Sequence, residues 1–457
     1  MSKFEKKLIN ISSKFIYLIL GLSIILLVAV LYQYYVIINA NYNDYYKSYS
    51  IFLIFFIFFW IAVLIFTKKA QPLILIFFIS IMSALYFVEI VFLSNIWLQF
   101  NKSQNFPGYD KRSKLEVIQD LNDDNAITAI SPKYIFFDDV KKKNIVPLSG
   151  VSNSKTIMCN ERGEWIIYRS DRYGFNNPDA AWENKKNDIM ILGDSFAYGS
   201  CVSQNENIAA NLRKKDLKTL SLAYAGNGPL SMLGTLKEFH KVTNPRYIIW
   251  TYYEGNDLFD LKRELSYNSF DFKNYFKKNF SQNLSDKQEQ VDTILRKLYQ
   301  ETLREKIDKK SKVHNDLIEA NQFVNKIHKF DLTKAITLYN IRALLGVIYT
   351  DHEKYIYESF LKVIHEAKKF SEEKNSELIF VYLPRFNATM KYSNTHNKEK
   401  IINLMNDVGI RVIDIDKLVF KSHADPLTLF PFKRKNHYNK EGYSLVSDAI
   451  FNNLINK

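Results

Sequence analysis

Three long apolar runs near the start of the chain most constrain its fold. They lie at Phe15–Ile38, Ile51–Phe66 and Leu73–Leu98, and short polar connections separate them. A helix that crosses a bilayer needs about 20 mostly apolar residues, although a single run of this kind could also form a buried core helix. Three runs in series favour membrane spans, and the first is too long for a cleaved signal peptide. We therefore expect residues 1–100 to form a three-helix transmembrane anchor.

The lysines predict how this anchor is oriented. Four lysines precede the first run and two lie between the second and third, whereas the loop between the first and second has one lysine against one aspartate. Positively charged loops stay in the cytoplasm. We expect a multi-pass protein of the cytoplasmic (inner) membrane, with a cytoplasmic N-terminus and everything after Leu98 outside. Glu89 lies inside the third run, and we expect it to face the other helices or the outer end rather than serve a proton path.

The remaining charge does not indicate a nucleic-acid partner. The net charge is +14, and residues 1–100 hold seven lysines and three acidic residues, so about +10 belongs to the outer part. We interpret this excess as a lysine-rich solvated surface, although it would also suit anionic glycans or lipid head groups. No nucleic-acid-binding motif is present, and we expect no nucleic-acid partner.

The two cysteines, Cys159 and Cys201, both lie in the outer part of the chain. Disulfides persist outside the cytoplasm. A bond between them would close a loop of about 42 residues and contribute about 4 kcal/mol in the chain-entropy model. Two buried thiols are the alternative, and we favour the disulfide.

The outer part falls into two regions. Residues 101–180 predict a linker and a small β-rich extension, with short apolar runs at Tyr134–Phe137, Ile145–Leu148 and Trp165–Tyr168. From residue 181 to 457, buried strands alternate with amphipathic helices, which favours a three-layer α/β/α domain with a central parallel sheet. Residues 261–350 are charged and predict a helical insertion. The expected strands are Ile189–Leu192, Thr219–Tyr224, Tyr247–Tyr252, Leu378–Tyr382 and Val412–Ile415.

Polar motifs follow the first three strands. Gly193-Asp194-Ser195 follows the first, Gly226 the second and Asn256-Asp257 the third, while His437 precedes the last helix. Each motif alone also fits a turn or a helix cap. In this order they resemble the SGNH hydrolase (GDSL esterase) superfamily, and the resemblance covers roughly residues 185–457. The stretch Asp171–Asn177, together with the residues around Ser195, is also similar to membrane-tethered bacterial members, including relatives of polysaccharide O-acetylation proteins.

The resemblance implies an SGNH/flavodoxin-like fold and a set of catalytic roles. Ser195 would be the nucleophile and His437 its general base. The oxyanion hole would consist of the Ser195 N–H, the Gly226 N–H and the Asn256 side-chain amide.

Two positions depart from the family pattern. Glu254 stands where the family has a glycine, two residues before the asparagine. Arg434 stands where the family has an aspartate, three residues before the histidine. Since that aspartate orients the imidazole, another group must do so here. We favour Asp425; the alternatives are Asp414, Asp416, and a Ser–His dyad whose imidazole is held by a backbone carbonyl.

These observations predict a serine ester hydrolase that acts outside the membrane on acyl, in particular acetyl, esters of glycans or glycolipids. The alternatives are a glycan O-acyltransferase that uses the same residues and a non-catalytic module of envelope assembly. We expect the bilayer, an acylated glycan or lipid-linked substrate, and envelope or polysaccharide-modification proteins as partners. We expect no cofactor, and no paired histidine spacing indicates a metal.

Overall fold

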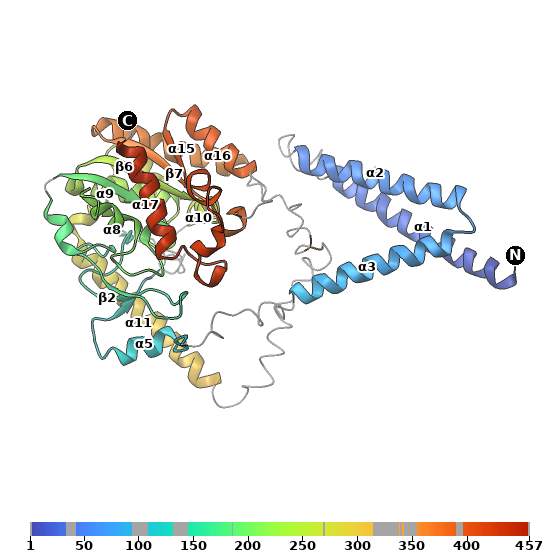
Figure 1. Cartoon of the computed structure of the whole chain (residues 1–457), viewed down its shortest axis with the longest axis horizontal. Helices are drawn as coiled ribbons and strands as arrows, with labels where there is room; N and C mark the ends of the chain where they lie inside the picture. Colours follow the sequence, from blue (N-terminus) through green and yellow to red (C-terminus); the bar gives the residue numbers. More distant parts are fainter. Residues whose placement is uncertain are drawn as a thin grey trace. The chain divides into compact units, whose positions relative to one another are not determined.

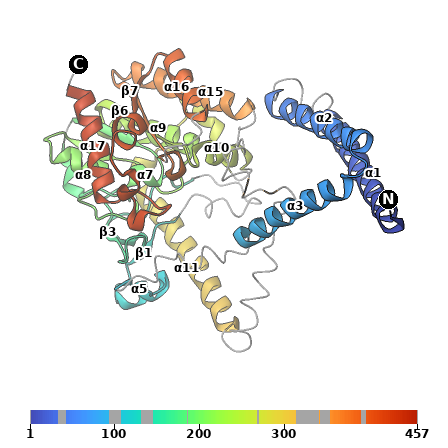
Figure 2. The same cartoon turned by 45° about the vertical axis from the view of Figure 1, so that its right-hand side comes forward.

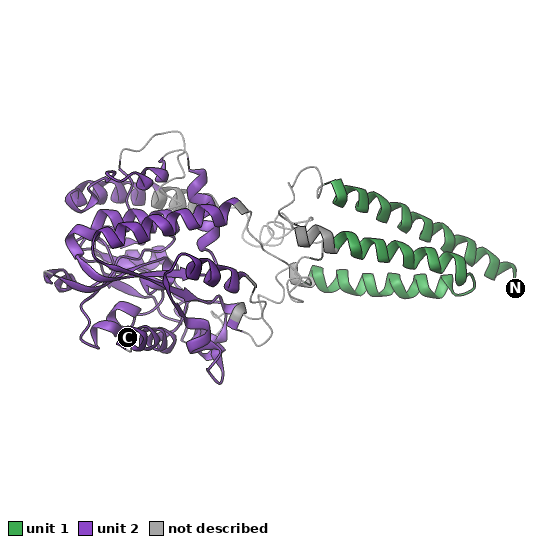
Figure 3. Cartoon of the chain, turned by 90° about the horizontal axis from the view of Figure 1, so that it is seen from above, with its two compact units in different colours: residues 1–101, 318–354 green, residues 102–317, 355–457 purple. Residues whose placement is uncertain are grey.

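The computed structural model describes residues 2–32, 43–93, 108–130, 145–184, 186–267, 270–313, 338, 341, 354–389 and 396–455. The chain forms two compact units, coloured separately in Figure 3. The first contains residues 1–101 and 318–354, and the second contains residues 102–317 and 355–457. The expected extension and α/β domain therefore share one unit. The run Tyr134–Phe137 and most of the second half of the expected insertion lie outside the described residues.

The first unit is built on α1 (Lys3–Tyr32), α2 (Asn43–Phe66) and α3 (Gln71–Leu93). Each helix is long and apolar enough to cross a membrane. A small core that includes Ile16 and Trp60 lies between them, while most of their other large apolar side chains are exposed. An apolar exposed surface of this extent suits contact with lipid rather than water.

Glu89 of α3 is fully buried in this unit. Its carboxylate accepts a hydrogen bond from the backbone N–H of Ile341 at 2.9 Å. Burial of a carboxylate is tolerated when it is hydrogen-bonded. Ile341, which belongs to the expected insertion, therefore contacts α3.

A five-stranded parallel sheet forms the centre of the second unit. It has the order β5-β4-β6-β7-β8 and confirms the expected parallel α/β domain. The strands read as apolar runs because both faces of the sheet are covered. Their bounds are β4 (Asn187–Leu192), β5 (Thr219–Ser221), β6 (Pro245–Tyr253), β7 (Glu377–Leu383) and β8 (Arg411–Asp414).

Helices cover both faces of this sheet and complete the three layers (Figures 1 and 2). Met190 and Leu192 of β4 pack into one core and Ile189 and Ile191 into the other, because side chains alternate along a strand. The first core contains α9 (Pro229–Thr243), α10 (Asp257–Ser266), α15 (Lys354–Glu373) and α16 (His396–Asp407). The second contains α7 (Ser195–Tyr198), α8 (Ile208–Arg213) and α17 (Lys440–Ile455).

A second, small sheet lies in the region expected to be β-rich. It has the order β1-β2-β3, with strands Ile127–Thr128, Lys155–Ile157 and Ile167–Arg169. The helix α5 (Lys114–Asp120) packs on this sheet. The long helix α11 (Gln288–Val313) comes after α10 in the sequence. The remaining short 3₁₀ or π turns are Asp179–Glu183, Phe272–Phe276, Leu284–Asp286, Phe386–Thr389, Asp416–Phe420, Pro426–Leu429 and Pro431–Lys433.

One apolar run of this region does not form a strand. The stretch Ile145–Leu148 is irregular. Its backbone pairs with a side chain instead of a strand, because both the N–H and the carbonyl of Val146 are bonded to the amide of Gln282, at 2.8 and 3.3 Å. Val146 and Leu148 are buried all the same, and Ile145 is partly buried, which explains the apolar run.

The strand order also locates the functional edge. The chain leaves β4 for β5 on one side and then returns to form β6 on the other side of β4. Open α/β sheets bind ligands at the carboxyl ends of the strands where the direction of winding reverses. The loops after β4 and β6, which carry Ser195 and Asn256, meet at this point.

Candidate active site

Ser195 begins α7 immediately after a sharp turn at the end of β4. A Cβ atom on Gly193 would lie 1.9 Å from Thr251 Oγ1, so only glycine fits between the two strands. Asp194 caps the helix by accepting a hydrogen bond from the Phe196 N–H at 2.9 Å. Ser195 stays partly exposed while Phe196 is buried, so the serine hydroxyl remains accessible.

His437 lies in the loop before α17 and is fixed by its neighbours. The Tyr438 hydroxyl donates to the Pro384 carbonyl at 2.9 Å, and Asn439 caps α17 by accepting from the Gly442 N–H at 3.0 Å. The Phe196 ring packs against the imidazole, with 4.7 Å between the ring centroids. These contacts hold the imidazole beside the start of α7.

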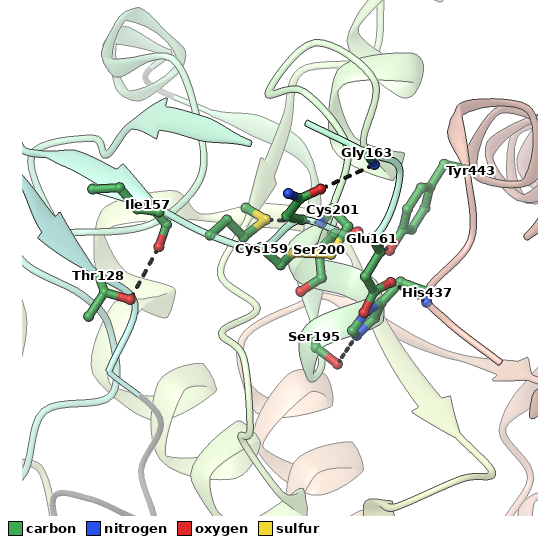
Figure 4. The surroundings of a disulfide bond; sticks show 12 residues. Thr128, Ile157, Cys159, Glu161, Gly163, Ser195, Ser200, Cys201, His437 and Tyr443 are labelled. Atoms are coloured by element: carbon green, nitrogen blue, oxygen red, sulfur yellow. Dashed lines mark hydrogen bonds and ion pairs between the residues drawn. A yellow bond between two sulfur atoms is a disulfide. The ribbon is translucent and has the colours of Figure 1, made fainter. Parts of the chain in front are cut away.

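The structure brings Ser195 and His437 together. The distance between Ser195 Oγ and His437 Nε2 is 2.9 Å (Figure 4). On the far side of the ring, His437 Nδ1 lies 3.0 Å from Glu161 Oε1, and the His437 backbone N–H donates to Glu161 Oε2 at 2.8 Å. The three side chains form a continuous hydroxyl–imidazole–carboxylate chain, as a serine nucleophile requires.

Burial and hydrogen bonding shift the pKa values of His437 and Glu161 in opposite directions. Burial alone would lower the pKa of His437, but the hydrogen bond and charge of Glu161, with a contribution from Asp194, raise it above its usual value of 6.5. Burial likewise raises the pKa of Glu161, and the bonds from His437 outweigh it, so that this pKa lies below its usual value. Glu161 is therefore ionised near neutral pH and stabilises the imidazolium that forms when His437 accepts a proton.

Asp425 is not the third member of this chain. Its carboxylate caps the turn at Pro426–Leu429 and binds Lys433 Nζ at 2.6 Å, and this ion pair lowers its pKa. The prediction of Asp425 is wrong because its carboxylate binds Leu427 and Lys433 within the loop that precedes His437. The two alternatives, Asp414 and Asp416, both bind Lys398, at 2.9 and 2.7 Å.

Glu161 was missed because it precedes His437 by 276 residues and lies outside the part of the chain that carries the family motifs. One signal could have revealed it. The structure joins Cys159 to Cys201 in a disulfide. Since Glu161 follows Cys159 by two residues and Cys201 follows Ser195 by six, the expected pairing already placed a carboxylate near the serine.

Gly226 and Asn256 lie on the same edge of the sheet as Ser195. Gly226 adopts a φ of 88° in the loop after β5, which is held at the end of β4 by a hydrogen bond from the Tyr224 N–H to the Gly193 carbonyl at 3.2 Å. The Asn256 amide donates to Asp260 Oδ2 at 2.7 Å and also lowers the pKa of Asp194, which burial raises. Both residues are placed near the nucleophile, and their role as oxyanion donors remains a prediction.

Glu254, the second departure from the family pattern, is buried beside Arg385. The distance from its Oε2 to Arg385 Nε is 3.7 Å. Burial raises the pKa of Glu254, and the charge of Arg385 opposes this change. The additional carboxylate is thus paired within the protein.

Glu161, Cys201 and His437 also bring three metal-binding atoms within 4.8 Å of one another. The disulfide occupies the sulfur of Cys201, while Ser195 and Glu161 occupy both nitrogens of His437. These bonds account for the grouping without a metal.

No protein-family model and no curated protein matches this chain. Several solved structures are similar to it. A protein described as a lipolytic member of the G-D-S-L family from Desulfitobacterium hafniense is 14% identical, with 58% of this chain and 98% of that chain covered and a TM-score of 0.29. A psychrotrophic esterase from Pseudoalteromonas is 12% identical, with 60% and 100% covered and a TM-score of 0.29. An acetyl xylan esterase is 11% identical, with 59% and 100% covered and a TM-score of 0.31. At these values the assignment of the fold rests on the strand order and the layers of the chain itself.

Proposed function

We propose that this protein is a membrane-anchored serine ester hydrolase. The observation that carries the proposal is the chain of hydrogen bonds from Ser195 through His437 to Glu161, at 2.9 and 3.0 Å. A serine hydroxyl is a weak nucleophile at neutral pH unless an adjacent base accepts its proton. His437 is such a base, and Glu161 holds it in the tautomer whose Nε2 is free to accept.

The geometry supports acyl transfer in two stages. Ser195 Oγ attacks the ester carbonyl while His437 accepts the hydroxyl proton, and the proton then passes to the departing alcohol. The oxyanion would be stabilised by the Ser195 N–H at the start of α7, the Gly226 N–H and the Asn256 amide. Water, activated by His437, would then release the acyl group from Ser195.

We place this activity outside the cytoplasmic membrane, on acyl esters of glycans or lipid-linked glycans. The three apolar helices and the distribution of lysines support the location. The disulfide supports it independently, since such bonds persist in oxidising compartments. The glycan substrate and any envelope partner are inferred from the similarity of Asp171–Asn177 to polysaccharide O-acetylation proteins.

A transferase would use the same residues, because only the second nucleophile differs. The non-catalytic alternative depended on Arg434 in place of the usual aspartate, and Glu161 offers the carboxylate that this alternative assumed to be missing. Adding an oligosaccharide during turnover distinguishes hydrolase from transferase, since a transferase would give acylated sugar at the expense of free acid.

The direct test is turnover of p-nitrophenyl acetate by the full-length protein in detergent, compared with Ser195→Ala. We expect the variant to lose activity by a factor of about 10³ or more while it stays folded. Ser203→Ala is a matched control, because this serine lies in the loop that follows α7 and has no part in the proposed chemistry. Equal turnover by the Ser195 variant and the unmodified protein would refute the proposal.

A further inference from the structure

The three proposed catalytic side chains come from different sheets. Ser195 follows β4 and His437 precedes α17, so the large sheet and its helices position both. Glu161 instead lies between β2 and β3 of the small sheet, at the tip of a hairpin that we call the carboxylate turn (residues 159–164). The position of Glu161 against His437 therefore depends on how this turn is attached to the large domain.

Three hydrogen bonds of the carboxylate turn lead to the segment before α5 rather than to the large sheet. The Asn160 amide donates to the Asp110 carbonyl at 2.7 Å, and the Asp110 N–H donates to the Gly163 carbonyl at 2.8 Å. The Tyr109 hydroxyl donates to the Asn160 carbonyl at 2.5 Å. These partners belong to the segment that precedes α5, so they shape the turn without fixing it beside His437.

Two further contacts connect the turn with the loop after α7, besides the bonds of Glu161 to His437. One is the disulfide between Cys159 and Cys201, which is also the centre of Figure 4. The other is the ion pair between Arg162 and Glu206, at 2.9 Å and partly exposed. Cys201 is 1% exposed and follows Ser195 by six residues, so the covalent link reaches the loop directly after the helix of the nucleophile.

We propose that this disulfide is the positioning element for Glu161, and that the ester hydrolase reaches its full rate only when the two cysteines are oxidised. The inference rests on the proposed function. Without the covalent link two residues before Glu161, the turn itself would keep the ion pair and the catalytic bonds. The strands beside it would stay attached through Met158 and Tyr168, which contact Cys201 and Tyr198, so the loss of the disulfide would free the turn and not the whole hairpin. A displacement of about 1 Å in a catalytic group can cost about 10²-fold in rate.

The disulfide between Cys159 and Cys201 can be reduced by dithiothreitol. One dithiothreitol molecule transfers two electrons to the disulfide, which gives the thiols of Cys159 and Cys201 and the cyclic oxidised form of the reagent. The chain contains only these two cysteines, so the reagent acts on one bond.

Thiols stay reduced in the cytoplasm. A newly made chain would therefore have low activity until its outer domain reached an oxidising compartment.

The test compares ester turnover by the full-length protein in detergent before and after dithiothreitol, with reduction measured by alkylation of both thiols. We expect kcat to fall by a factor of about 10–100, with little change in KM, and to recover after oxidation with oxidised glutathione. The half-maximal pH of kcat/KM should also move down, because His437 loses the charge that raises its pKa.

Glu161→Gln provides the control background. This variant already lacks the carboxylate, so reduction should cost it less than about threefold if the disulfide acts through Glu161. Equal losses in both backgrounds would show that the disulfide only stabilises the fold, and an unchanged kcat after complete reduction would also overturn the inference. Absence of turnover in the untreated protein would instead refute the proposed function, and with it this inference.

Discussion

At the scale of single residues, the environment of His437 determines how the site responds to pH. Its imidazole contacts a hydroxyl on one side and a carboxylate on the other, and the carboxylate raises its pKa. A general base must be unprotonated before it can act. The charge that stabilises the imidazolium during the reaction therefore also shifts the activity of the free enzyme towards higher pH.

We accordingly expect kcat/KM to rise with pH through a half-maximal point above 6.5, the usual pKa of histidine. In Glu161→Gln, the half-maximal pH should fall, and the plateau rate should decrease by about 10²–10⁴-fold because the imidazole is less well oriented. A pH–rate profile of both proteins measures the two effects. A midpoint that is the same in both would show that Glu161 does not set this pKa.

The choice between Glu161 and Asp425 can be tested in the same assay. Asp425 binds Lys433 at the surface and does not contact His437, so Asp425→Ala should keep its activity within about twofold. Glu161→Ala should lose at least about 10²-fold. The reverse order of the two losses would restore Asp425 as the catalytic carboxylate.

At the scale of elements, the turn Asp171–Asn177 forms hydrogen bonds with β5 of the large sheet and with α7. The side chain of Asn177 bonds to both the N–H and the carbonyl of Ser221 in β5, at 3.0 and 2.9 Å. Asn176 donates to the Tyr198 carbonyl at the end of α7.

The fully buried Asp171 accepts four hydrogen bonds, from the backbone of Tyr173 and Phe175 and the side chains of Asn177 and Trp182. The motif thus supports the helix of the nucleophile without reaching the site.

Asp171→Ala should lower the free energy of unfolding by at least about 2 kcal/mol, because buried donors would lose their acceptor. Asp179→Ala is the matched control. It removes an exposed ion pair with Arg172 and an exposed hydrogen bond from the Arg172 backbone N–H, so its effect should stay below about 1 kcal/mol. Thermal unfolding of the detergent-solubilised proteins measures both changes, and equal melting temperatures for the two variants would contradict this role of Asp171.

At the scale of the whole molecule, the three apolar helices and the disulfide-linked α/β domain require different surroundings. The helices expose large apolar side chains that suit lipid, whereas the oxidised cysteines suit an extracytoplasmic compartment. The excess of lysines in the first half of α1 and between α2 and α3 is consistent with the same arrangement.

In bacterial spheroplasts treated with protease, we therefore expect loss of an epitope placed after Lys457 and protection of one placed before Met1. Both epitopes should be lost when the spheroplasts are lysed, which controls for access of the protease. Protection of the C-terminal epitope, with loss of the N-terminal one, would reverse the orientation.

The sequence alone determined the features that local patterns encode. Apolar runs of the right length predicted the membrane helices and the sheet strands. Polar residues at strand ends predicted Ser195 at the carboxyl edge of the sheet, because parallel strands end on a common edge. Only the tertiary structure decided which carboxylate meets His437. Asp425 was favoured for its closeness in sequence, yet its loop satisfies it locally, while Glu161 arrives from a separate small sheet. The contact depends on how the two sheets pack against each other, and no local sequence pattern encodes that packing.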